Sequence, residues 1–255
     1  MNKDELYHTW LKEEKIAHIK GWDFSHINDR YKEEDKLPWD YLRIIKQYLK
    51  DDMHILDLDT GGGEFLLGLN HPYELIAATE NYPPNIAYCK EKLLPLGIDF
   101  KDADAKGGLP FDDNTFDIVL NRHGDFNPDE IKRVLKPGGY FITQQVGALN
   151  DRDLVISLLG DLPLPFPRQY LAIIESDFIK AGFTIIKSDE AFNPIIFYDV
   201  GALVWFAHII EWEFPNFSVD KHLKQLYNLQ AILEKEGYIK GTTHRFMLVA
   251  QKPSI

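Results

Sequence analysis

The sequence predicts an α/β protein built on a doubly wound, mostly parallel seven-stranded sheet, and three observations carry this prediction. From residue 53 onward, short apolar runs of strand length alternate with longer segments whose apolar residues recur at helical spacing. The first apolar run leads into three consecutive glycines, 61–63, and then into a helical pattern. A Pro-Gly-Gly turn at 137–139 leads from a later helix into another strand. Such alternation is typical of a parallel sheet covered by helices on both faces.

Residues 1–52 precede the first strand, and we expect them to form an N-terminal helical cap. Helical spacing of apolar residues covers 3–20 and returns at 39–50, directly after Pro38. The stretch 21–36 is rich in turn-forming and charged residues, which indicates a connector.

Residues 53–191 carry the alternating pattern and are the expected core. In chain order, strands are expected at 55–58, 75–79, 99–101, 116–121, 140–146 and 183–188. The helices between them are expected at 64–69, 83–94, 127–135 and 170–181. In the third of these helices, Asn127 is a side-chain cap, Pro128 suits the first turn, and Glu130 stands where a capping box needs its acid.

Residues 192–238 interrupt the alternation with two more helical stretches, 200–211 and 219–236. We interpret this block as a helical insertion before the last strand, which is expected at 244–251 within the final segment 239–255. The chain has 255 residues, of which 45% are apolar, enough to bury one large core. We therefore expect residues 1–255 to form a single domain.

Composition restricts the function classes. The chain has 28 Lys and Arg against 40 Asp and Glu, so its net charge of -12 does not favour a nucleic-acid partner. Cys89 is the only cysteine, which rules out an internal disulfide and a cysteine-cluster zinc site. The nine histidines lack metal-ligand spacing. No apolar run reaches the ~18 residues of a membrane helix, and the charged start differs from a signal peptide. A cytoplasmic protein without metal, nucleic-acid or membrane partners is expected.

The strand followed by glycines and a helix is a typical ligand site of open α/β sheets. Glycine lets the backbone approach a ligand closely, and the first amides of the following helix offer free hydrogen-bond donors. A nicotinamide dinucleotide site needs a third glycine three residues after the second. Counting from Gly61 and Gly63, that position holds Leu66, so dinucleotide binding is disfavoured.

Further motifs follow in a fixed order along the chain. They are Asp57, Asp59, Gly61 and Gly63, then Glu80, Asp104–Ala105, Leu109–Pro110–Phe111, Phe116 to Val119, and Arg133 to Gly139. In this order and spacing they resemble the class I S-adenosylmethionine-dependent methyltransferases, and specifically the small-molecule type that is methyltransferase type 11-like. The resemblance covers roughly residues 50–190 and the last strand. It implies a Rossmann-like methyltransferase fold in which 53–191 bind the cofactor.

The resemblance also implies roles for single residues. Asp57 supports the glycine loop near the methionine end of S-adenosylmethionine, and Glu80 accepts both ribose hydroxyls. Asp104 faces adenine, with Asp102 as the alternative because one extra residue lies within this motif. The full set of implied cofactor-binding residues is Asp57, Asp59, Thr60, Gly61, Gly63, Glu80, Asn81, Asp104, Ala105, Asn121 and Arg122.

Several of these residues have a simpler interpretation as well. Asp57 could only cap a turn. Asp59 stands where the family has a glycine; its carboxylate could pair with the cofactor's ammonium and repel its carboxylate, or it could merely tolerate a positive φ and point to water. His123 is the candidate catalytic base, or else a histidine that packs locally. Of Gln144 and Gln145, only one is expected to face the ligand edge, because strand side chains alternate.

The function implied is the S-adenosylmethionine-dependent transfer of a methyl group to a small or medium-sized molecule. An RNA-base methyltransferase and a non-catalytic S-adenosylmethionine-binding module are the alternatives. The five tryptophans lie in the N-terminal cap (Trp10, Trp22, Trp39) and in the late insertion (Trp205, Trp212). In this family, those two regions commonly form a substrate lid. Each tryptophan could alternatively fasten a helix to the core.

Overall fold

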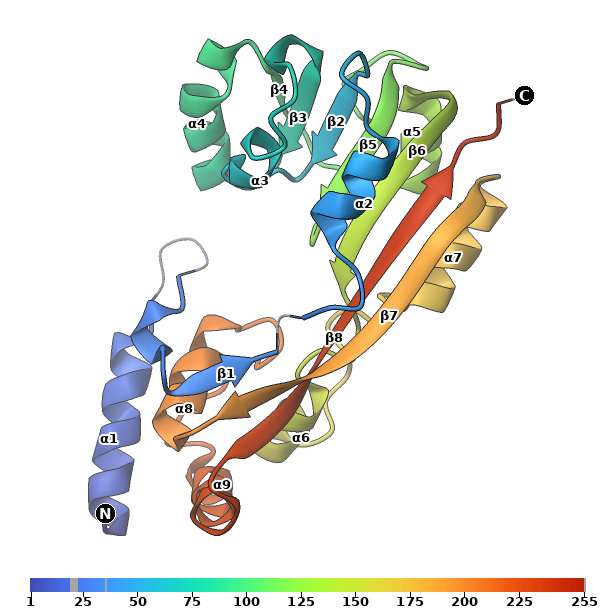
Figure 1. Ribbon diagram of the computed structural model, residues 1–255. Helices are drawn as coiled ribbons and strands as arrows, with labels where there is room; N and C mark the ends of the chain where they lie inside the picture. Colours follow the sequence, from blue (N-terminus) through green and yellow to red (C-terminus); the bar gives the residue numbers. More distant parts are fainter. Residues whose placement is uncertain (19–22, 35, 255) are drawn as a thin grey trace. The chain divides into compact units, whose positions relative to one another are not determined.

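The computed structural model describes residues 1–18, 23–34 and 36–254. The chain divides into two compact units, each assembled from separate segments (Figure 1). The first unit consists of Met1–Leu37, Ala148–Pro167 and Ala191–His244, and the second of Pro38–Gly147, Arg168–Glu190 and Arg245–Ile255. The chain thus passes from one unit to the other five times. The single domain remains a prediction.

The second unit contains the parallel sheet. Its strands are β2 (Ile55–Leu58), β3 (Ile76–Glu80), β4 (Asp99–Asp102), β5 (Phe116–Arg122) and β6 (Leu135–Val146), together with parts of β7 (Thr184–Phe197) and β8 (Ile239–Gln251). The order is β7-β8-β6-β5-β2-β3-β4. The pairs from β6 to β4 are parallel, and β8 is antiparallel to β6, with Thr143 opposite Leu248. The mostly parallel α/β sheet is confirmed.

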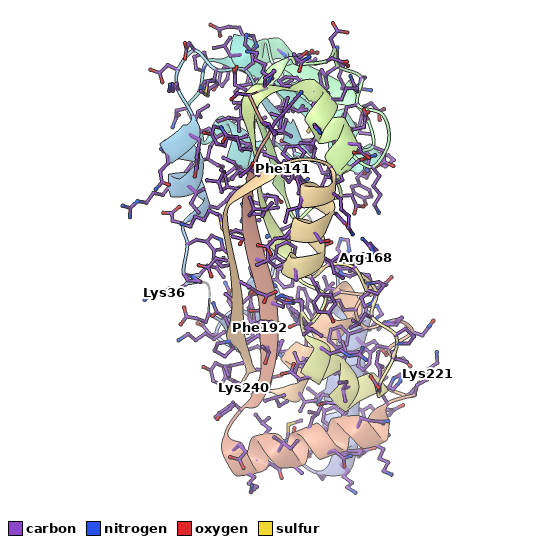
Figure 2. All side chains as sticks on the ribbon, turned by 90° about the vertical axis from the view of Figure 1, so that its right-hand side faces the viewer. Lys36, Phe141, Arg168, Phe192, Lys221 and Lys240 are labelled. Atoms are coloured by element: carbon purple, nitrogen blue, oxygen red, sulfur yellow. The ribbon has the colours of Figure 1, made fainter. Side chains whose placement is uncertain are left out.

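Helices cover both faces of this sheet. Helix α2 (Tyr41–Tyr48) lies on one face, and α5 (Pro128–Val134) and α7 (Leu171–Lys180) lie on the other (Figures 1 and 2). Phe141 of β6, labelled in Figure 2, stacks on Phe178 of α7 with 4.9 Å between the ring centres. The remaining helical elements of the unit are α3 (Glu64–Leu67), α4 (Pro83–Lys92) and the short 3-10 turns η2 (Tyr73–Leu75) and η3 (Leu94–Leu96).

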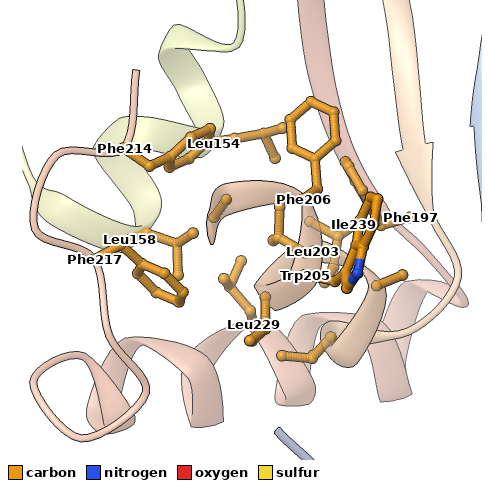
Figure 3. Packing of buried hydrophobic residues seen from close by; sticks show 14 of the residues in the cluster. Leu154, Leu158, Phe197, Leu203, Trp205, Phe206, Phe214, Phe217, Leu229 and Ile239 are labelled. Carbon is orange, nitrogen blue, oxygen red and sulfur yellow. The ribbon is translucent and has the colours of Figure 1, made fainter. Parts of the chain in front are cut away.

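The first unit is mainly helical. It contains α1 (Lys3–Ile16), η1 (Ser25–Ile27), β1 (Tyr31–Glu33), α6 (Arg152–Leu159), α8 (Val200–Ile209) and α9 (Leu223–Glu236). Every residue from Val200 to Ala207 is buried, so α8 is apolar on all sides and forms the centre of this unit. Figure 3 shows Trp205 and Phe206 packed with side chains from α6, α9 and the adjoining strands.

The sheet has eight strands, so the predicted number of seven is corrected. The additional strand is β1, which lies in the expected connector and pairs antiparallel with β7, Tyr31 opposite Phe197. Three residues of mixed polarity are too short to show a period of two, so this strand has no signal in the sequence. Helix α6 was likewise not predicted. No helix among the described residues is long and apolar enough to cross a bilayer.

Two tryptophans have the packing role. Trp10 and Trp205 are each 1% exposed and belong to the core of the first unit. Trp39 is also buried, and its indole nitrogen donates to Gln144 at 2.8 Å. Trp212 is 45% exposed, and Trp22 lies outside the described residues.

Candidate functional site

The candidate site lies at the carboxyl ends of β2, β3 and β5 in the second unit. These strands are neighbours in parallel register, with Leu58 of β2 opposite Asn121 of β5. The residues that follow them are therefore brought to one edge of the sheet, where open α/β sheets bind their ligands. The glycine loop after β2, the acid that ends β3 and the loop after β5 meet there.

The glycine loop is held by backbone hydrogen bonds. The amide of Thr60 donates to the carbonyl of Thr79 at 2.9 Å, and the amide of Gly63 donates to the carbonyl of Thr60 at 3.0 Å. Gly61 and Gly63 have φ of +64° and +81°, where an L side chain is strained. A Cβ added at Gly61 would meet nothing within 4 Å, so the backbone is bare on that side.

Glu80 joins the loop to the start of α4. Its side chain is buried, and Oε2 accepts the amide of Gly61 at 2.8 Å. Oε1 accepts the amides of Asn81 and Tyr82, both at 2.9 Å. Asn85 donates to Oε2 over a longer 3.3 Å. The structure therefore places the predicted ribose acceptor against the glycine loop.

Asp57 is hydrogen-bonded to the glycine loop. The side chain is buried at the end of β2 and accepts the hydroxyl of Thr60 at 2.7 Å. Burial raises the pKa of Asp57 to about 7, and the negative charges of Asp59 and Glu80 act in the same direction.

Asp59 has the positive φ that one interpretation requires, at +53°. Its side chain, however, does not simply point to water. Oδ2 accepts the amide of Asp125 in the loop after β5 at 3.0 Å, and Oδ1 is buried without a hydrogen-bond partner in the described part of the chain. Burial raises the pKa of Asp59 to about 7, and Glu80, Asp125 and Asp104 add to the rise.

Asn121 is fully buried and joins several strand ends. Its amide nitrogen donates to the carbonyls of Leu58 and Asp125 at 3.2 and 3.3 Å. Its amide oxygen accepts from Gln145 and from the hydroxyl of Thr143. The side chain thus faces the protein interior and organises the loops around it.

The next two residues leave the strand. Arg122 is exposed, and its guanidinium lies 5.4 Å from the ring centre of Phe65, which in turn stacks on Tyr41. His123 has φ of +60°, and its amide donates to the carbonyl of Gln144 at 2.9 Å.

The histidine is neutral at pH 7. His123 is exposed, and desolvation of its ring, with the charges of Arg245 and Arg122, lowers its pKa to about 3. A ring with so low a pKa is a weak base.

Gln144 and Gln145 are both buried. Gln144 accepts from Trp39, and its amide nitrogen lies 3.4 Å from Nε2 of His123. Gln145 donates to Asn121 and accepts from Gln169 at 3.2 Å. Because side chains alternate along β6, Gln144 and Gln145 belong to different hydrogen-bond networks. Only the network of Gln144 includes a candidate catalytic residue, His123.

The predicted adenine region is more open. Asp104 is exposed and accepts the amide of Lys106 at 2.9 Å, while Ala105 is fully buried. Asp102, the alternative, is exposed and lies 3.8 Å from Lys90. Asn81 is also exposed. The choice between Asp104 and Asp102 stays a prediction.

The Leu-Pro-Phe motif is held by an arginine clamp. Arg133 donates to the carbonyls of Leu109 and Phe111 at 2.8 and 2.7 Å and pairs with Glu130. Glu130 also accepts the amide of Leu109 at 2.7 Å. The predicted capping box is therefore only half correct. Asn127 caps α5 through its side chain, as expected. The prediction that Glu130 completes the box is wrong, because its carboxylate contacts Leu109 and Arg133 instead.

Four residues near the loop were not predicted. Asp125 and Gly124 meet Asp59, and a Cβ at Gly124 would lie 2.7 Å from it, so only glycine fits. The thiol of Cys89 donates to the carbonyl of Gly61 at 3.0 Å, and burial raises its pKa to about 11. Tyr41 donates to the carbonyls of Asn121 and Ile142. Spacing gives no sign of these contacts, because the sheet register creates them. No cluster of potential metal ligands occurs among the described residues.

Residues 56–143 match the protein-family model described as a methyltransferase domain. A phthiotriol/phenolphthiotriol dimycocerosates methyltransferase of Mycobacterium ulcerans is 39% identical over 88 residues, which cover 32% of this chain and 33% of that protein. A fatty-acid O-methyltransferase of Mycolicibacterium smegmatis is 32% identical over 111 residues, covering 41% of this chain and 40% of that protein. A sterol 4-C-methyltransferase of Caenorhabditis elegans is 30% identical over 119 residues, covering 42% and 35%. The chain therefore spans about a third of the length of the curated relatives it matches.

Two solved structures have a similar fold. A candidate methyltransferase of Bacillus halodurans has a TM-score of 0.55 at 16% identity and covers 83% of this chain and 98% of its own. The YcgJ protein of Bacillus subtilis has a TM-score of 0.54 at 16% identity, with coverage of 83% and 97%. At this identity the likeness concerns the fold.

Proposed function

We propose that this chain, whose residues 56–143 match a methyltransferase domain, transfers a methyl group from S-adenosylmethionine to a small or medium-sized molecule. The observation that carries the proposal is the contact between the Glu80 carboxylate and the amide of Gly61. It fixes the acid of β3 beside a bare glycine backbone, which is the arrangement that the cofactor's ribose and methionine ends require.

The residues present fit this cofactor. Asp59 keeps one buried carboxylate oxygen free of hydrogen bonds within the described chain, and the backbone at Gly61 faces open space. Backbone amides take three of the four acceptor positions of Glu80. Glu80 would therefore accept a ribose hydroxyl at Oε2, in place of the long contact from Asn85. Asp57 and Thr60 would keep the loop in shape, and Asp104 with Ala105 would lie along adenine.

The cofactor supplies a methyl group already activated on a sulfonium, so the protein mainly has to position the acceptor and exclude water. Arg122 and His123 follow β5 and are the groups best placed to contact an acceptor. His123 stays neutral at pH 7, and its Nε2 faces the amide nitrogen of Gln144, which can only donate. The proton of the ring therefore lies on Nδ1, from which His123 would donate a hydrogen bond to the acceptor, and strong general-base catalysis is not required of it.

We also infer that the acceptor is an apolar, lipid-like molecule. Three of the matched relatives are named for action on dimycocerosates, a fatty acid and a sterol. A cytoplasmic location belongs to this proposal, since the buried Cys89 thiol suits a reducing compartment.

The test begins with calorimetric titration of S-adenosylmethionine and S-adenosylhomocysteine. Binding tighter than millimolar is expected, and failure of both ligands to bind would refute the proposal. Methyl transfer is then measured with isotopically labelled cofactor against a lipid extract and an aqueous metabolite extract. Product in the lipid extract is expected, whereas product in the aqueous extract alone would contradict the lipid-like acceptor.

Two outcomes favour the alternatives. Salt-sensitive RNA binding in a gel shift would support an RNA-base methyltransferase, against the net charge of -12. Tight cofactor binding without product from any extract would support a non-catalytic binding module, the alternative that Asp59 in place of a family glycine suggests.

A further inference from the structure

Asp59 combines three properties. It stands at the position where the family motif has its first glycine, its backbone is left-handed with φ of +53°, and its carboxylate turns inward. An aspartate that served only to relieve the backbone could point to solvent. Here Oδ1 is buried and accepts no hydrogen bond from the described residues, which costs free energy unless a ligand uses it.

The carboxylate is held in place. Oδ2 accepts the amide of Asp125 at 3.0 Å, and the side chain packs against the bare backbone of Gly124. One oxygen is thereby fixed by the loop after β5 and the other is left for a donor. A group positioned in this way loses little freedom on binding.

The charges facing Asp59 are mainly negative. Asp57 comes from β2, Glu80 from β3, Asp104 from the segment after β4, and Asp125 from the loop after β5. The ammonium of Lys106 pairs with Asp125 at 2.7 Å, and Arg122 faces Asp57. The field at Asp59 therefore favours a cation and disfavours an anion.

A primary ammonium suits the position next to Oδ1 of Asp59, because it is a cation with several hydrogen-bond donors. A metal ion is disfavoured, because the described residues contain no group of three potential ligands. The methionine end of the cofactor carries an ammonium and a carboxylate on one carbon. A fixed carboxylate attracts the first and repels the second, so it also sets their orientation.

We propose that Asp59 pairs with the ammonium group of the cofactor and makes the site selective for ligands that carry this group. The inference rests on the proposed function, since it assigns a specificity-determining residue in the same cofactor site. Adenosine thioethers with an amino group should bind, and those without one should bind weakly.

Three probes separate the parts of the cofactor. S-adenosylhomocysteine carries the ammonium and the carboxylate, its decarboxylated analogue carries the ammonium alone, and 5′-methylthioadenosine carries neither. Calorimetric titration is run on the wild type, D59N and D59G. D59N keeps the shape and removes the charge, and D59G restores the family residue and relieves the positive φ.

We expect both variants to bind S-adenosylhomocysteine and its decarboxylated analogue about 10- to 100-fold more weakly, the range for a lost hydrogen bond to a charged group. Binding of 5′-methylthioadenosine should stay within about twofold, since it never contacts Asp59. In the wild type, affinity for the ammonium ligands should rise from pH 5.5 to 7 as Asp59 ionises, and D59N should reduce this rise.

Unchanged binding of S-adenosylhomocysteine by D59N, or an equal loss for all three probes in D59N and D59G, would overturn the inference and leave the proposed function standing. If the wild type bound none of the probes, the proposed function and this inference would both fail. Circular dichroism of each variant shows whether it is folded; if D59N does not fold, D59G decides the outcome.

Discussion

At the scale of single residues, the carboxylate of Glu80 gathers four donors. Three of them are backbone amides, from Gly61, Asn81 and Tyr82, and the fourth is the side chain of Asn85. The same acid therefore shapes the glycine loop and, in the proposed function, binds ribose. A substitution of Glu80 should therefore change both the stability of the loop and the binding of the cofactor, and the two effects have to be measured separately.

Glu80→Ala should weaken binding of S-adenosylmethionine by roughly 1 to 3 kcal/mol, because it leaves a ribose hydroxyl and loop amides unpaired. Glu80→Gln, which keeps one acceptor oxygen, should lie between this variant and the wild type. Calorimetric titration measures the affinity, and thermal unfolding reports damage to the loop. Glu91→Ala, an exposed substitution on α4, is the control and should change neither. Equal affinity of Glu80→Ala and the wild type would count against the ribose role.

Asp57 and Asp59 make stability depend on pH. Both carboxyls have pKa values of about 7 in the folded chain, against 3.8 as their ordinary value. Between pH 4 and 7 the folded state therefore binds more protons than the unfolded state, and the free energy of unfolding decreases as pH rises.

Asp59→Asn removes one of these groups and also lessens the repulsion on Asp57. The decrease in unfolding free energy from pH 5 to 7.5 should become smaller by about 1 to 2 kcal/mol, after allowing for solvent screening. Urea unfolding at the two pH values measures it. Asp51→Asn, at an exposed position, should leave the decrease as it is in the wild type. Parallel curves for the wild type and Asp59→Asn would contradict the assignment.

At the scale of elements, the strands of the candidate site were readable from the sequence. Strand β2 lies at the predicted residues, and β3, β4 and β5 begin and end within one residue of them. Strands β2, β3 and β5 are mainly apolar runs, which gives a clear local signal. Strand β4 is mostly polar, and its place was predicted from the turn at Pro95 and Gly97 before it. Strand β1 and helix α6 have no such signal, because they are short and are stabilised by contacts distant in sequence.

The candidate site divides in the same way. The glycine loop, Glu80 and Asp57 were predicted because a motif fixes their spacing. Asp125 and Gly124 were not, since they reach the loop only through the pairing of β5 with its neighbours. Tyr41 was not either, since it contacts β5 and β6 from helix α2.

Helix α2 is fastened to the sheet by Tyr41. Its buried hydroxyl lies 3.0 Å from the carbonyls of Asn121 and Ile142. Tyr41→Phe should lower the free energy of unfolding by about 1 kcal/mol, the usual value for one buried hydrogen bond. Tyr48→Phe, on the same helix but only half-buried, is the matched control and should change stability less. Denaturant unfolding distinguishes them, and equal effects would show that the hydroxyl of Tyr41 is unimportant.

At the scale of the whole molecule, two hydrophobic cores share one chain that crosses between them five times. Strands β7 and β8 contribute residues to both units without a break. Unfolding one unit therefore withdraws part of the other's sheet, which favours a cooperative transition. If the chain is a single domain, as its composition predicts, both units should unfold together in one transition.

Scanning calorimetry should show one transition. Phe214→Ala in the first core and Phe178→Ala in the second should each cost about 3 to 5 kcal/mol and lower the same midpoint, since both rings are buried. Two transitions, each lowered by only one of the variants, would show that the units unfold independently. Phe166→Ala, at an exposed position, is the control.

The pairing of β6 with β8 also bears on synthesis at the ribosome. Residues 140–146 of β6 take their outer partner from residues 245–251, which are translated about 100 residues later. At ~5 to 20 residues per second, the edge of the nascent sheet stays open for about 5 to 20 s. An open edge is a template for pairing with another chain. Chaperones, or close spacing of ribosomes on one messenger RNA, should therefore affect how much of the chain folds correctly during synthesis. This effect should be larger than the free energy of unfolding of the finished protein would suggest.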